Sequence, residues 1–337
     1  MTRKKIILVF MMALMISLLL LSSSMVFAGE GSKSEKELLR IGSSSLGSTA
    51  YIHFEACSFV VNKHSDKLKA SSISTAGSSE NIVLLDEGVI DLGTAGTLDV
   101  FAAYEGEKWD KIIPVWQVCS YTYWPQPMIV LENSNLNSID DLVGESVSLI
   151  KKGSGSEYMW SIILEEYGIL DKVKKNYLGW SDSYDALVDN LIVACPGNYP
   201  GGKPNPAMER LATRKNYKAL DIDLEILKKA NKRNPGILIS SLPKSAYKNF
   251  EKDIPCAGIA GVILSTEKVS DEKIYEFCKA VYENIDELHE LSSVSGATTL
   301  DNATKWLMKE YPIHPGAAKY FKEKGVWNNE LTIGERK

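Results

Sequence analysis

Arginine is scarce in this sequence, and it carries no metal-site or nucleotide-site pattern. The only arginines after residue 28 are Arg40, Arg210, Arg214, Arg233 and Arg336. The four histidines and five cysteines lack metal-ligand spacing, which argues against a metal centre. No G-x-G-x-x-G, G-x-x-x-x-G-K-[ST] or G-x-S-x-G motif is present, so dinucleotide, P-loop and nucleophile-elbow sites are not indicated. We therefore expect no metal, no other cofactor and no catalytic residue.

Cysteine is also sparse, and no two cysteines form a C-x-x-C pair. The five are Cys57, Cys119, Cys195, Cys256 and Cys278. An odd count leaves at least one thiol unpaired. Four of them stand in apolar or helical segments, so we expect small, buried hydrophobic residues. One or two disulfides remain the alternative, because an exported protein meets an oxidising environment.

Long apolar runs are confined to the first 28 residues. The basic residues 3–5, the apolar run 6–21 and the segment Val26-Phe27-Ala28 form an export signal, with cleavage expected before Gly29. An uncleaved anchor is the alternative, because an apolar run of this length is marginal for a membrane span. Residues 29–37 are polar and are expected to form a linker. We expect an exported protein, in the periplasm or on the extracytoplasmic face of a bacterial membrane.

The net charge excludes some partners. Losing the three positive charges of residues 1–28 changes the net charge from −5 to −8. A negative chain is poorly suited to nucleic acid or to an anionic membrane surface, so we expect neither partner. An anionic ligand would have to be attracted by local groups.

A loop of small hydroxyl-bearing residues follows the first expected strand. Residues 38–41 are a short apolar run, and 52–62 carry apolar residues at helical spacing. The loop between them supplies Ser44, Ser45 and Thr49, and Tyr51 follows. A strand that ends in such a loop and continues as a helix leaves free backbone N–H groups, which favour an anion. An ordinary strand–helix turn with a capping serine is the alternative.

Two further loops have the same character. Residues 74–81 contain Ser78, and residues 151–157 contain Ser154 and Ser156. Their spacing along the chain suggests one anionic ligand held between two lobes. None of the three loops contains an arginine, so backbone amides, hydroxyls and helix dipoles would hold the ligand in place of a guanidinium fork. We accordingly expect Arg210 and Arg214 to matter little for binding.

Aromatic residues are expected to set ligand selectivity. Residues 121–127 are dense in aromatics and prolines, which is unusual for a regular element. We interpret this segment as an irregular crossover and cleft wall that presents Tyr123, with a packed hinge as the alternative. Trp180 follows the expected strand 173–178, at the strand end where ligand sites gather in α/β sheets.

Alternating strand and helix patterns predict an α/β fold with two lobes, each a mainly parallel sheet flanked by helices, and a ligand cleft between them. We expect residues 38–125 in lobe 1, 126–254 in lobe 2 and 255–337 back in lobe 1. Helices are expected at 81–87, 272–291 and 299–309.

Several segments together resemble one known family. They are Ile41-Gly42, Gly47-Ser48-Thr49, Tyr51, Ser74–Asn81, Gly153-Ser154-Gly155-Ser156, Pro204-Asn205-Pro206-Ala207 and Ile313–Phe321. Over residues 38–327 the sequence resembles the TAXI type of solute-binding receptor of tripartite ATP-independent periplasmic (TRAP) transporters. The resemblance implies a periplasmic-binding-protein-like fold, without catalysis. It also implies a receptor, expected to be a monomer, that hands a small organic anion to an ion-gradient-driven membrane permease. The ligand would be an amino acid or dicarboxylate such as glutamate or 2-oxoglutarate.

The sequence departs from the family pattern in the first loop. The family's G-G-T-Y-Y becomes Gly47-Ser48-Thr49-Ala50-Tyr51, and the strand before Pro196 lacks the usual acidic residue. These differences imply a larger cleft or a different ligand. Two other roles stay open: a sensor subunit for a membrane kinase, and an exported hydrolase. A hydrolase is disfavoured because the two S-x-x-K segments of this sequence, within residues 241–248, are not accompanied by an S-D-N or K-T-G motif.

Overall fold

Two mixed β-sheets, one in each lobe, organise the chain. The computed structural model describes residues 35–44, 46 and 48–336, and Glu37–Lys337 form one unit. The expected signal segment 1–28 and the candidate residue Ser45 lie outside the described residues. Among the helices described, none has the length and apolar character needed to cross a bilayer.

The first sheet has the strand order β10-β11-β3-β1-β2, and β4 pairs with β11. Its strands are β1 (Glu37–Gly42), β2 (Leu68–Ile73), β3 (Leu92–Gly96), β4 (Trp116–Gln126), β10 (Leu238–Leu242) and β11 (Ile254–Ser265). Strand β1 is parallel to β2 and β3, whereas β11 is antiparallel to β3, β4 and β10. The carboxyl ends of β1 and β3 therefore lie at the same edge of the sheet.

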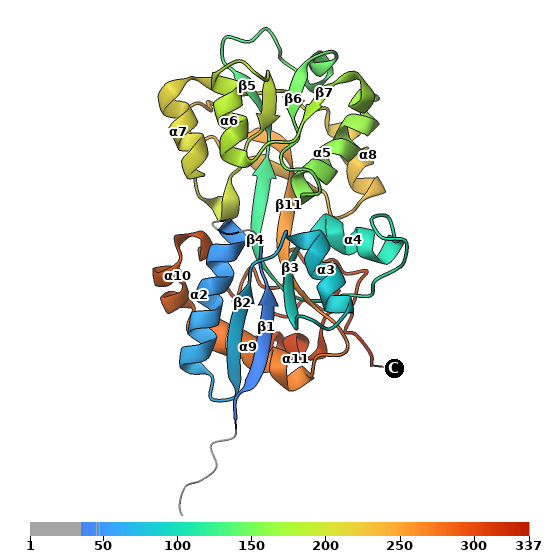
Figure 1. Cartoon of the computed structure of the whole chain (residues 1–337), viewed down its shortest axis with the longest axis vertical. Helices are drawn as coiled ribbons and strands as arrows, with labels where there is room; N and C mark the ends of the chain where they lie inside the picture. The colour runs from blue at the N-terminus through green and yellow to red at the C-terminus, as the bar shows by residue number, and fades with distance from the viewer. Residues whose placement is uncertain (1–34, 45, 47, 337) are drawn as a thin grey trace, which may run out of the picture. The chain divides into compact units, whose positions relative to one another are not determined.

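The second sheet has the order β7-β6-β8-β5-β9. Its strands are β5 (Met128–Leu131), β6 (Ser146–Ser148), β7 (Lys174–Asn176), β8 (Ala194–Pro196) and β9 (Tyr217–Ala219). Strand β6 is parallel to β7 and β8, and β5 is antiparallel to β8 and β9. The expected two-lobed α/β fold is confirmed, with the refinement that both sheets are mixed. Figure 1 shows β4 and β11 running from one lobe into the other.

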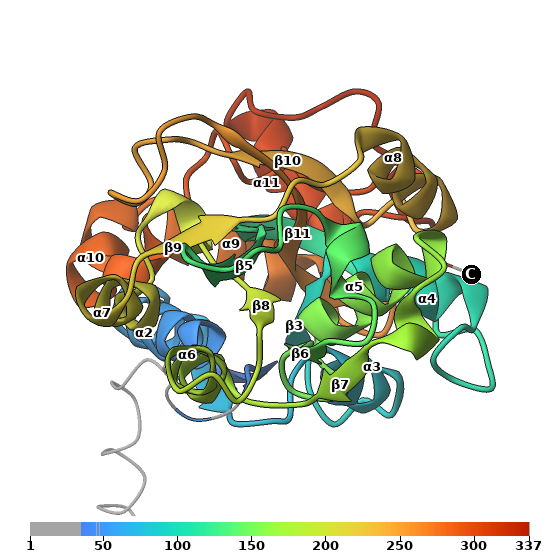
Figure 2. The ribbon, with the colours of Figure 1, turned by 90° about the horizontal axis from the view of Figure 1, so that it is seen from above.

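Helices flank both sheets. Those of the first lobe are α2 (Thr49–His64), α3 (Ser78–Asp86), α4 (Thr97–Glu105), α9 (Asp271–Tyr282), α10 (Ile285–Leu291) and α11 (Pro315–Glu323). Those of the second lobe are α5 (Gly155–Glu166), α6 (Trp180–Val188), α7 (Pro206–Arg214) and α8 (Leu224–Arg233). Four short 3₁₀ turns are described: η1 (Ile139–Leu142), η2 (Leu170–Lys172), η3 (Pro200–Gly202) and η4 (Ser293–Ser295). Seen from above in Figure 2, α6 and α7 lie on one side of the second sheet, and α5 and α8 on the other.

The segment expected to be irregular, residues 121–127, is instead mostly strand. Residues through Gln126 belong to β4, which pairs with β11 along nearly its whole length. Register shifts at Gly261/Val262 and Ile263/Leu264 adjust the pairing. Long-range pairing therefore overrides the local preference of prolines and aromatics for turns.

Two expected helices also differ from the structure. Residues 299–309 form turns, because their backbone groups bond to β4: Ala303 O accepts from Ser120 N at 2.8 Å, and Met308 N donates to Gln117 Oε1 at 2.9 Å. The expected helix 272–291 is divided into α9 and α10 around Asn284.

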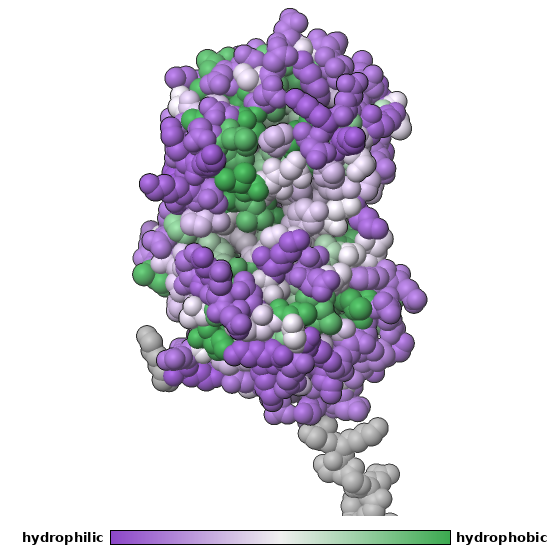
Figure 3. Space-filling model, turned by 180° about the vertical axis from the view of Figure 1, so that it is seen from behind, coloured by the Kyte–Doolittle hydropathy of each residue, from purple (hydrophilic) through white to green (hydrophobic). Residues whose placement is uncertain are grey.

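The hydrophobic core divides along the lobes. One cluster fills the first lobe and two fill the second, one of them under α5 and α8 and the other under α6 and α7. Leu98 of α4 and Ile259 of β11 belong to a second-lobe cluster, so these elements join the lobes. Strand β10 lies in the first sheet although its residues fall in the range expected for lobe 2, and the lobe boundaries stay a prediction. Both ends of the molecule are hydrophilic in Figure 3, and hydrophobic residues gather nearer the middle.

All five cysteines are buried and unpaired, which confirms that they act as small hydrophobic residues. Burial raises the pKa of each thiol, as it does for Cys57 and Cys195. They therefore stay protonated and unreactive.

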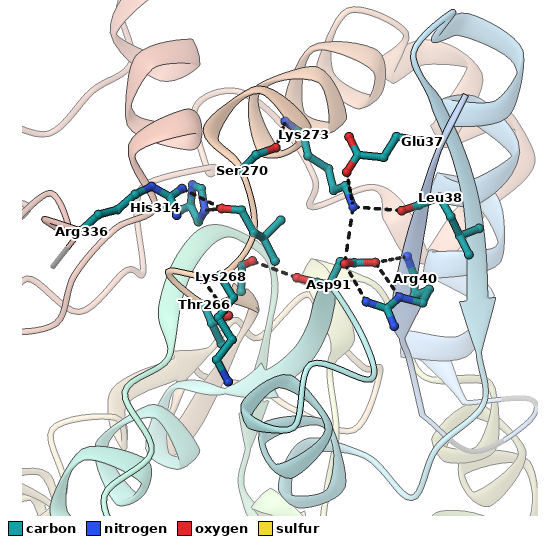
Figure 4. Close-up of polar contacts among 12 residues, drawn as sticks. Glu37, Leu38, Arg40, Asp91, Thr266, Lys268, Ser270, Lys273, His314 and Arg336 are labelled. Atoms are coloured by element: carbon teal, nitrogen blue, oxygen red, sulfur yellow. Dashed lines mark hydrogen bonds and ion pairs between the residues drawn. The ribbon is translucent and has the colours of Figure 1, made fainter. Parts of the chain in front are cut away.

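An ion cluster fixes the first strand to β3 and α9 (Figure 4). The Asp91 carboxylate accepts hydrogen bonds from the backbone N–H of Arg40 at 2.7 Å and from its guanidinium at 3.0 Å. Lys273 donates to Leu38 O at 3.0 Å, and its Nζ lies 2.7 Å from Glu37 Oε1 and 3.5 Å from Asp91 Oδ1. The start of the described fold is thus held by charge-assisted bonds.

Candidate ligand-binding cleft

A cavity of about 500 Å³ lies between the lobes, and the N-terminal ends of helices from both lobes open onto it. From the first lobe come the starts of α2, α3 and α4; from the second come those of α5, α6 and α7. The lining residues at these ends are Ser48, Thr49, Ala50, Gly77, Ser78, Gly96, Ser154, Gly155, Ser156, Trp180, Ser181, Asn205, Pro206 and Ala207.

Serine side chains begin two of these helices in the same way. Ser48 Oγ accepts from Tyr51 N at 3.1 Å at the start of α2, and Ser154 Oγ accepts from Glu157 N at 3.2 Å at the start of α5. The amides of the residues just after each cap have no carbonyl to bond within the helix. The N-termini of α2 and α5 therefore present N–H donors and positive dipole ends to the cavity, one in each lobe.

Asn81 positions the first-lobe edge of the cleft. Its side-chain amide donates to Ser43 O at 2.8 Å and to Thr94 O at 2.9 Å. These carbonyls follow or lie in β1 and β3, so one buried side chain ties two strand ends and the start of α3 together. Gly77 precedes α3 with φ of 112°, a conformation that glycine adopts without steric cost.

The back wall of the cleft is aromatic and uncharged. Tyr121 lines it, and its hydroxyl lies 2.7 Å from Thr94 Oγ1. His53 stacks on Tyr121 with ring centroids 4.6 Å apart, and its Nδ1 lies 2.8 Å from Ser295 Oγ. Burial, with a smaller contribution from His289, lowers the pKa of His53 to about 3. The imidazole is therefore neutral at physiological pH and adds no charge to the site.

Among the described lining residues, Arg210 is the only charged side chain. It projects from α7, and its Nη2 lies 3.4 Å from Ser181 Oγ. Acidic residues occur nearby but serve other groups: Glu80 accepts from Ala76 N, and Glu157 accepts from Gly153 N at 3.2 Å. The helix ends and Arg210 thus give the cavity a positive character.

The side-chain oxygens of two buried amides at the cavity have no partners. Gln126 and Asn198 line it and are only 2% and 6% exposed. Within the described part of the chain, neither Gln126 Oε1 nor Asn198 Oδ1 has a hydrogen-bond partner. Buried polar atoms are normally satisfied, so these two groups point to a ligand that would complete them.

The structure brings most of the candidate residues from the sequence together. Those that line the cavity are Ser44, Thr49, Ser78, Ser154, Ser156 and Trp180. Ser78 is the first residue of α3 and not its cap, since Gly77 holds that position. Whether these residues bind a ligand stays a prediction.

Two expected aromatic residues lie elsewhere. Tyr51 is not among the residues that line the cavity. Tyr123 lines a second cavity of about 640 Å³, where its ring packs against Trp306 with centroids 4.8 Å apart. Side chains normally alternate in direction along a strand, but the register shift between Gly261 and Val262 leaves Tyr121 without a pairing partner on β11. The alternation is broken there, so Tyr121 and Trp124 both line the cavity, whereas Tyr123 does not. Trp124 takes the position in the cavity that the sequence assigned to Tyr123.

Sequence reasoning missed Arg210, Gln126 and Asn198. Asn205 caps α7 by accepting from Ala207 N at 2.8 Å, and Pro206 is the first helical residue. This start signal places Arg210 near the cleft end of its helix, so the capping pattern could have identified it. Gln126 and Asn198 each lie at or just after a strand end, which is the position where ligand contacts gather.

Comparison with known proteins gives the family and the fold. The sequence matches the NMT1-like family over residues 41–325. The chain belongs to that family. Among solved structures, it is similar to XAC2383 from Xanthomonas citri bound to ATP, with 12% identity, a TM-score of 0.50 and coverage of 86% of this chain and 96% of that one.

Comparison also finds similarity to two further solved structures. One is the periplasmic aliphatic sulphonate binding protein SsuA from Escherichia coli, with 17% identity, a TM-score of 0.45 and coverage of 86% of this chain and 79% of that one. The other is the probable amino-acid ABC transporter extracellular-binding protein YtmK from Bacillus subtilis, with 14% identity, a TM-score of 0.46 and coverage of 78% and 99%. This NMT1-like protein has a two-lobed α/β fold, and such identities do not transfer a ligand.

Proposed function

We propose that this NMT1-like protein is an extracytoplasmic solute-binding protein that captures a small organic anion in the cleft and delivers it to a membrane permease. The observation that carries the proposal is the convergence of helix N-termini from both lobes on one cavity whose described lining contains a single charged side chain, Arg210. Two-lobed binding proteins close around a solute by rotation of the lobes about a hinge.

The finer proposal follows from the resemblance to TAXI receptors. The permease would be of the TRAP type, driven by an ion gradient, and the ligand an amino acid or dicarboxylate such as glutamate or 2-oxoglutarate. Each charge-assisted hydrogen bond contributes roughly 1.5–3 kcal/mol, and a helix terminus adds up to about 1 kcal/mol. Five or six such contacts are compatible with about micromolar affinity once association costs are included.

Titration calorimetry on purified protein tests the proposal. The panel is 2-oxoglutarate, L-glutamate, L-malate and L-aspartate, measured on the unmodified chain and on Thr49→Ala and Ser154→Ala. We expect each variant to weaken the tightest-binding acid by roughly tenfold, because each loses a polar group at a helix start that faces the cavity.

Ser71→Ala provides the matched control, because Ser71 is an exposed residue of β2 outside the cavity. Its affinity should equal that of the unmodified chain. If none of the four acids binds at millimolar concentration, or if the control weakens binding as much as Thr49→Ala does, the proposed function is wrong.

A further inference from the structure

We propose that the cleft selects organic anions that carry no ammonium group. A keto- or hydroxydicarboxylate should bind more tightly than the amino acid of the same length. This inference rests on the proposed function and narrows its ligand class. It derives from three features of the cavity: the positive character of its ends, the absence of a carboxylate from its described lining, and two amide oxygens without a partner in the described residues.

The charge at the cavity surface favours a carboxylate. Each helix N-terminus carries a partial positive charge of roughly half an electron, and the starts of six helices open onto the cavity together with Arg210. A carboxylate is stabilised anywhere along such a surface. An ammonium group is repelled by it and loses its hydration on entry, and this loss is unfavourable unless a counter-charge replaces the water.

An ammonium group would need an acidic residue at the cavity to supply that counter-charge. The residues described as lining the cavity include no aspartate or glutamate. Glu80 and Glu157 accept hydrogen bonds from loop amides beside their own helices. Asp99 is a buried carboxylate close to the cavity: an added Cβ on the lining residues Gly96 and Gly155 would lie 3.2 Å and 3.6 Å from its Oδ2. Its Oδ1 is ion-paired with Lys108, which balances its charge, whereas its Oδ2 has no hydrogen-bond partner among the described residues.

The backbones of Asn198 and Gln126 are held in place. The main chain of Asn198 is held on both sides, because Tyr247 donates to its carbonyl at 2.6 Å and its N–H points to Met208 Sδ at 3.0 Å. The backbone of Gln126 is fixed by pairing with Ala257 of β11. Their side-chain amides are therefore presented from fixed positions.

A neutral amide matches a neutral oxygen of the ligand. Turning an amide by half a rotation exchanges its acceptor oxygen for its NH2 donors at one place. Gln126 and Asn198 can thus donate to a keto oxygen or accept from a hydroxyl. An amide oxygen also accepts from an ammonium group, but it brings no full charge to oppose the surrounding positive ends.

The test compares acids in pairs that differ at one carbon. Titration calorimetry on the full chain with 2-oxoglutarate against L-glutamate, and with L-malate against L-aspartate, should give at least tenfold tighter binding of the amine-free acid in each pair that binds. An amino acid that binds as tightly as its partner or more tightly overturns the inference and leaves the proposed function intact. Binding of none of the four contradicts the proposed function itself, and this inference with it.

Isosteric variants test the mechanism. Asn198→Asp and Gln126→Glu place a carboxylate where each amide stands, so each should shift the preference at least tenfold towards the amino acid. Asn135→Asp adds the same charge at an exposed position outside the cavity and should leave the preference unchanged. Thermal unfolding of each variant establishes that it folds, and the comparison on the unmodified chain decides the inference even where a variant does not.

The variant Asp99→Asn tests the alternative in which Asp99 binds the ammonium group of an amino acid. If the ammonium group of an amino acid were bound through the buried Asp99, this variant would lose L-glutamate binding selectively, and that result would overturn the inference. We expect the ratio of the two affinities to stay within about twofold of its original value.

Discussion

Arg210 and Arg214 stand one helical turn apart on α7 but meet different surroundings. Arg210 lines the cleft, whereas Arg214 is ion-paired with Asp185 of α6 and with Asp189, which follows that helix. The expectation from sequence was that neither would matter, because neither lies in a small-polar loop. The position of Arg210 in the cavity revises that expectation for one of the two.

We predict that Arg210→Ala weakens 2-oxoglutarate binding by about ten- to a hundredfold, which corresponds to the roughly 1.5–3 kcal/mol of one charge-assisted hydrogen bond. Arg214→Ala is the control on the same helix and should change affinity less than twofold. Titration calorimetry on both variants measures this. Equal losses in the two would show that the effect comes from the overall charge of α7 and not from contact in the cleft.

Asp91 gives a prediction for acid stability. Burial opposes its ionisation, but hydrogen bonds from the Arg40 side chain and backbone, together with Lys273, outweigh burial and lower the pKa of Asp91. Because the folded-state pKa is below the unfolded value of about 3.9, the stabilisation is complete above about pH 4. It is lost as the pH falls through the folded-state pKa.

We predict that Asp91→Asn lowers the free energy of unfolding by about 1.5–3 kcal/mol at pH 7, the contribution of hydrogen bonds to a charged group. The loss should shrink as the pH falls below about 4. Urea denaturation at pH 7 and at pH 3 measures both effects. Asp171→Asn, at a side chain that is 97% exposed, should change stability by less than about 0.5 kcal/mol at either pH. A loss that stays constant with pH would contradict the role of the charge.

At this scale, the sequence predicts residues whose position follows from local chemistry. Ser154 and Thr49 are cap or first-turn residues in loops after strands, and this pattern is readable without a structure. Gln126, Asn198 and Arg210 reach the cavity only because β4, β8 and α7 are brought together by the topology. Tyr123 lines a different cavity from the other candidate residues, because the direction of a side chain depends on a strand register that the sequence does not specify.

Among the elements, α4 makes a close backbone contact with the segment between α8 and β10. Thr97 Oγ1 donates to Gly236 O at 2.6 Å, and Asn234 Nδ2 donates to Leu98 O at 3.1 Å. A Cβ on Gly236 would lie 2.3 Å from Leu98 N and 2.4 Å from Leu98 Cα. Backbone atoms cannot give way as a flexible side chain does, so this contact requires glycine.

We predict that Gly236→Ala lowers the free energy of unfolding by at least 1–3 kcal/mol, as overpacking typically does. Gly296→Ala is the matched control, because its added Cβ would meet nothing closer than 3.5 Å and its φ is −60°. Differential scanning calorimetry should show a lower melting temperature for the first variant and little change for the second. Equal melting temperatures for the two variants would mean that α4 can move away from residue 236 without a loss of stability.

Element types were predictable where periodicity and loop chemistry agree, as for α2, α5 and the strands before them. The prediction was wrong for residues 121–126 and 299–309, where the backbone bonds to a distant part of the chain. Prolines and aromatics lie within β4 because β11 supplies the pairing, and residues 299–309 bond to β4 in place of forming a helix. Such partners lie far away in sequence, so local propensity cannot indicate them.

On the scale of the whole molecule, the two long strands β4 and β11 connect the lobes, and the cavity lies between the lobes that they join. They pair antiparallel from Ala257↔Gln126 to Ser265↔Trp116. Bending two connecting strands disturbs less packing than sliding one part of a hydrophobic core past another. We therefore expect the lobes to move by rotation about β4 and β11.

We predict that ligand shifts this two-lobed molecule towards a closed state. An anion bound between the starts of α2 and α5 contacts both lobes at once, so it stabilises only conformations in which the lobes are close. Small-angle X-ray scattering with saturating 2-oxoglutarate, or whichever acid of the panel binds most tightly, should give a smaller radius of gyration than scattering without it. The same concentration of glucose controls for solvent contrast. Arg210→Ala, measured at the same concentration of the acid but with most of its sites unoccupied, controls for ionic strength. An unchanged radius at demonstrated saturation would contradict lobe closure, because the bound anion would then favour both states equally.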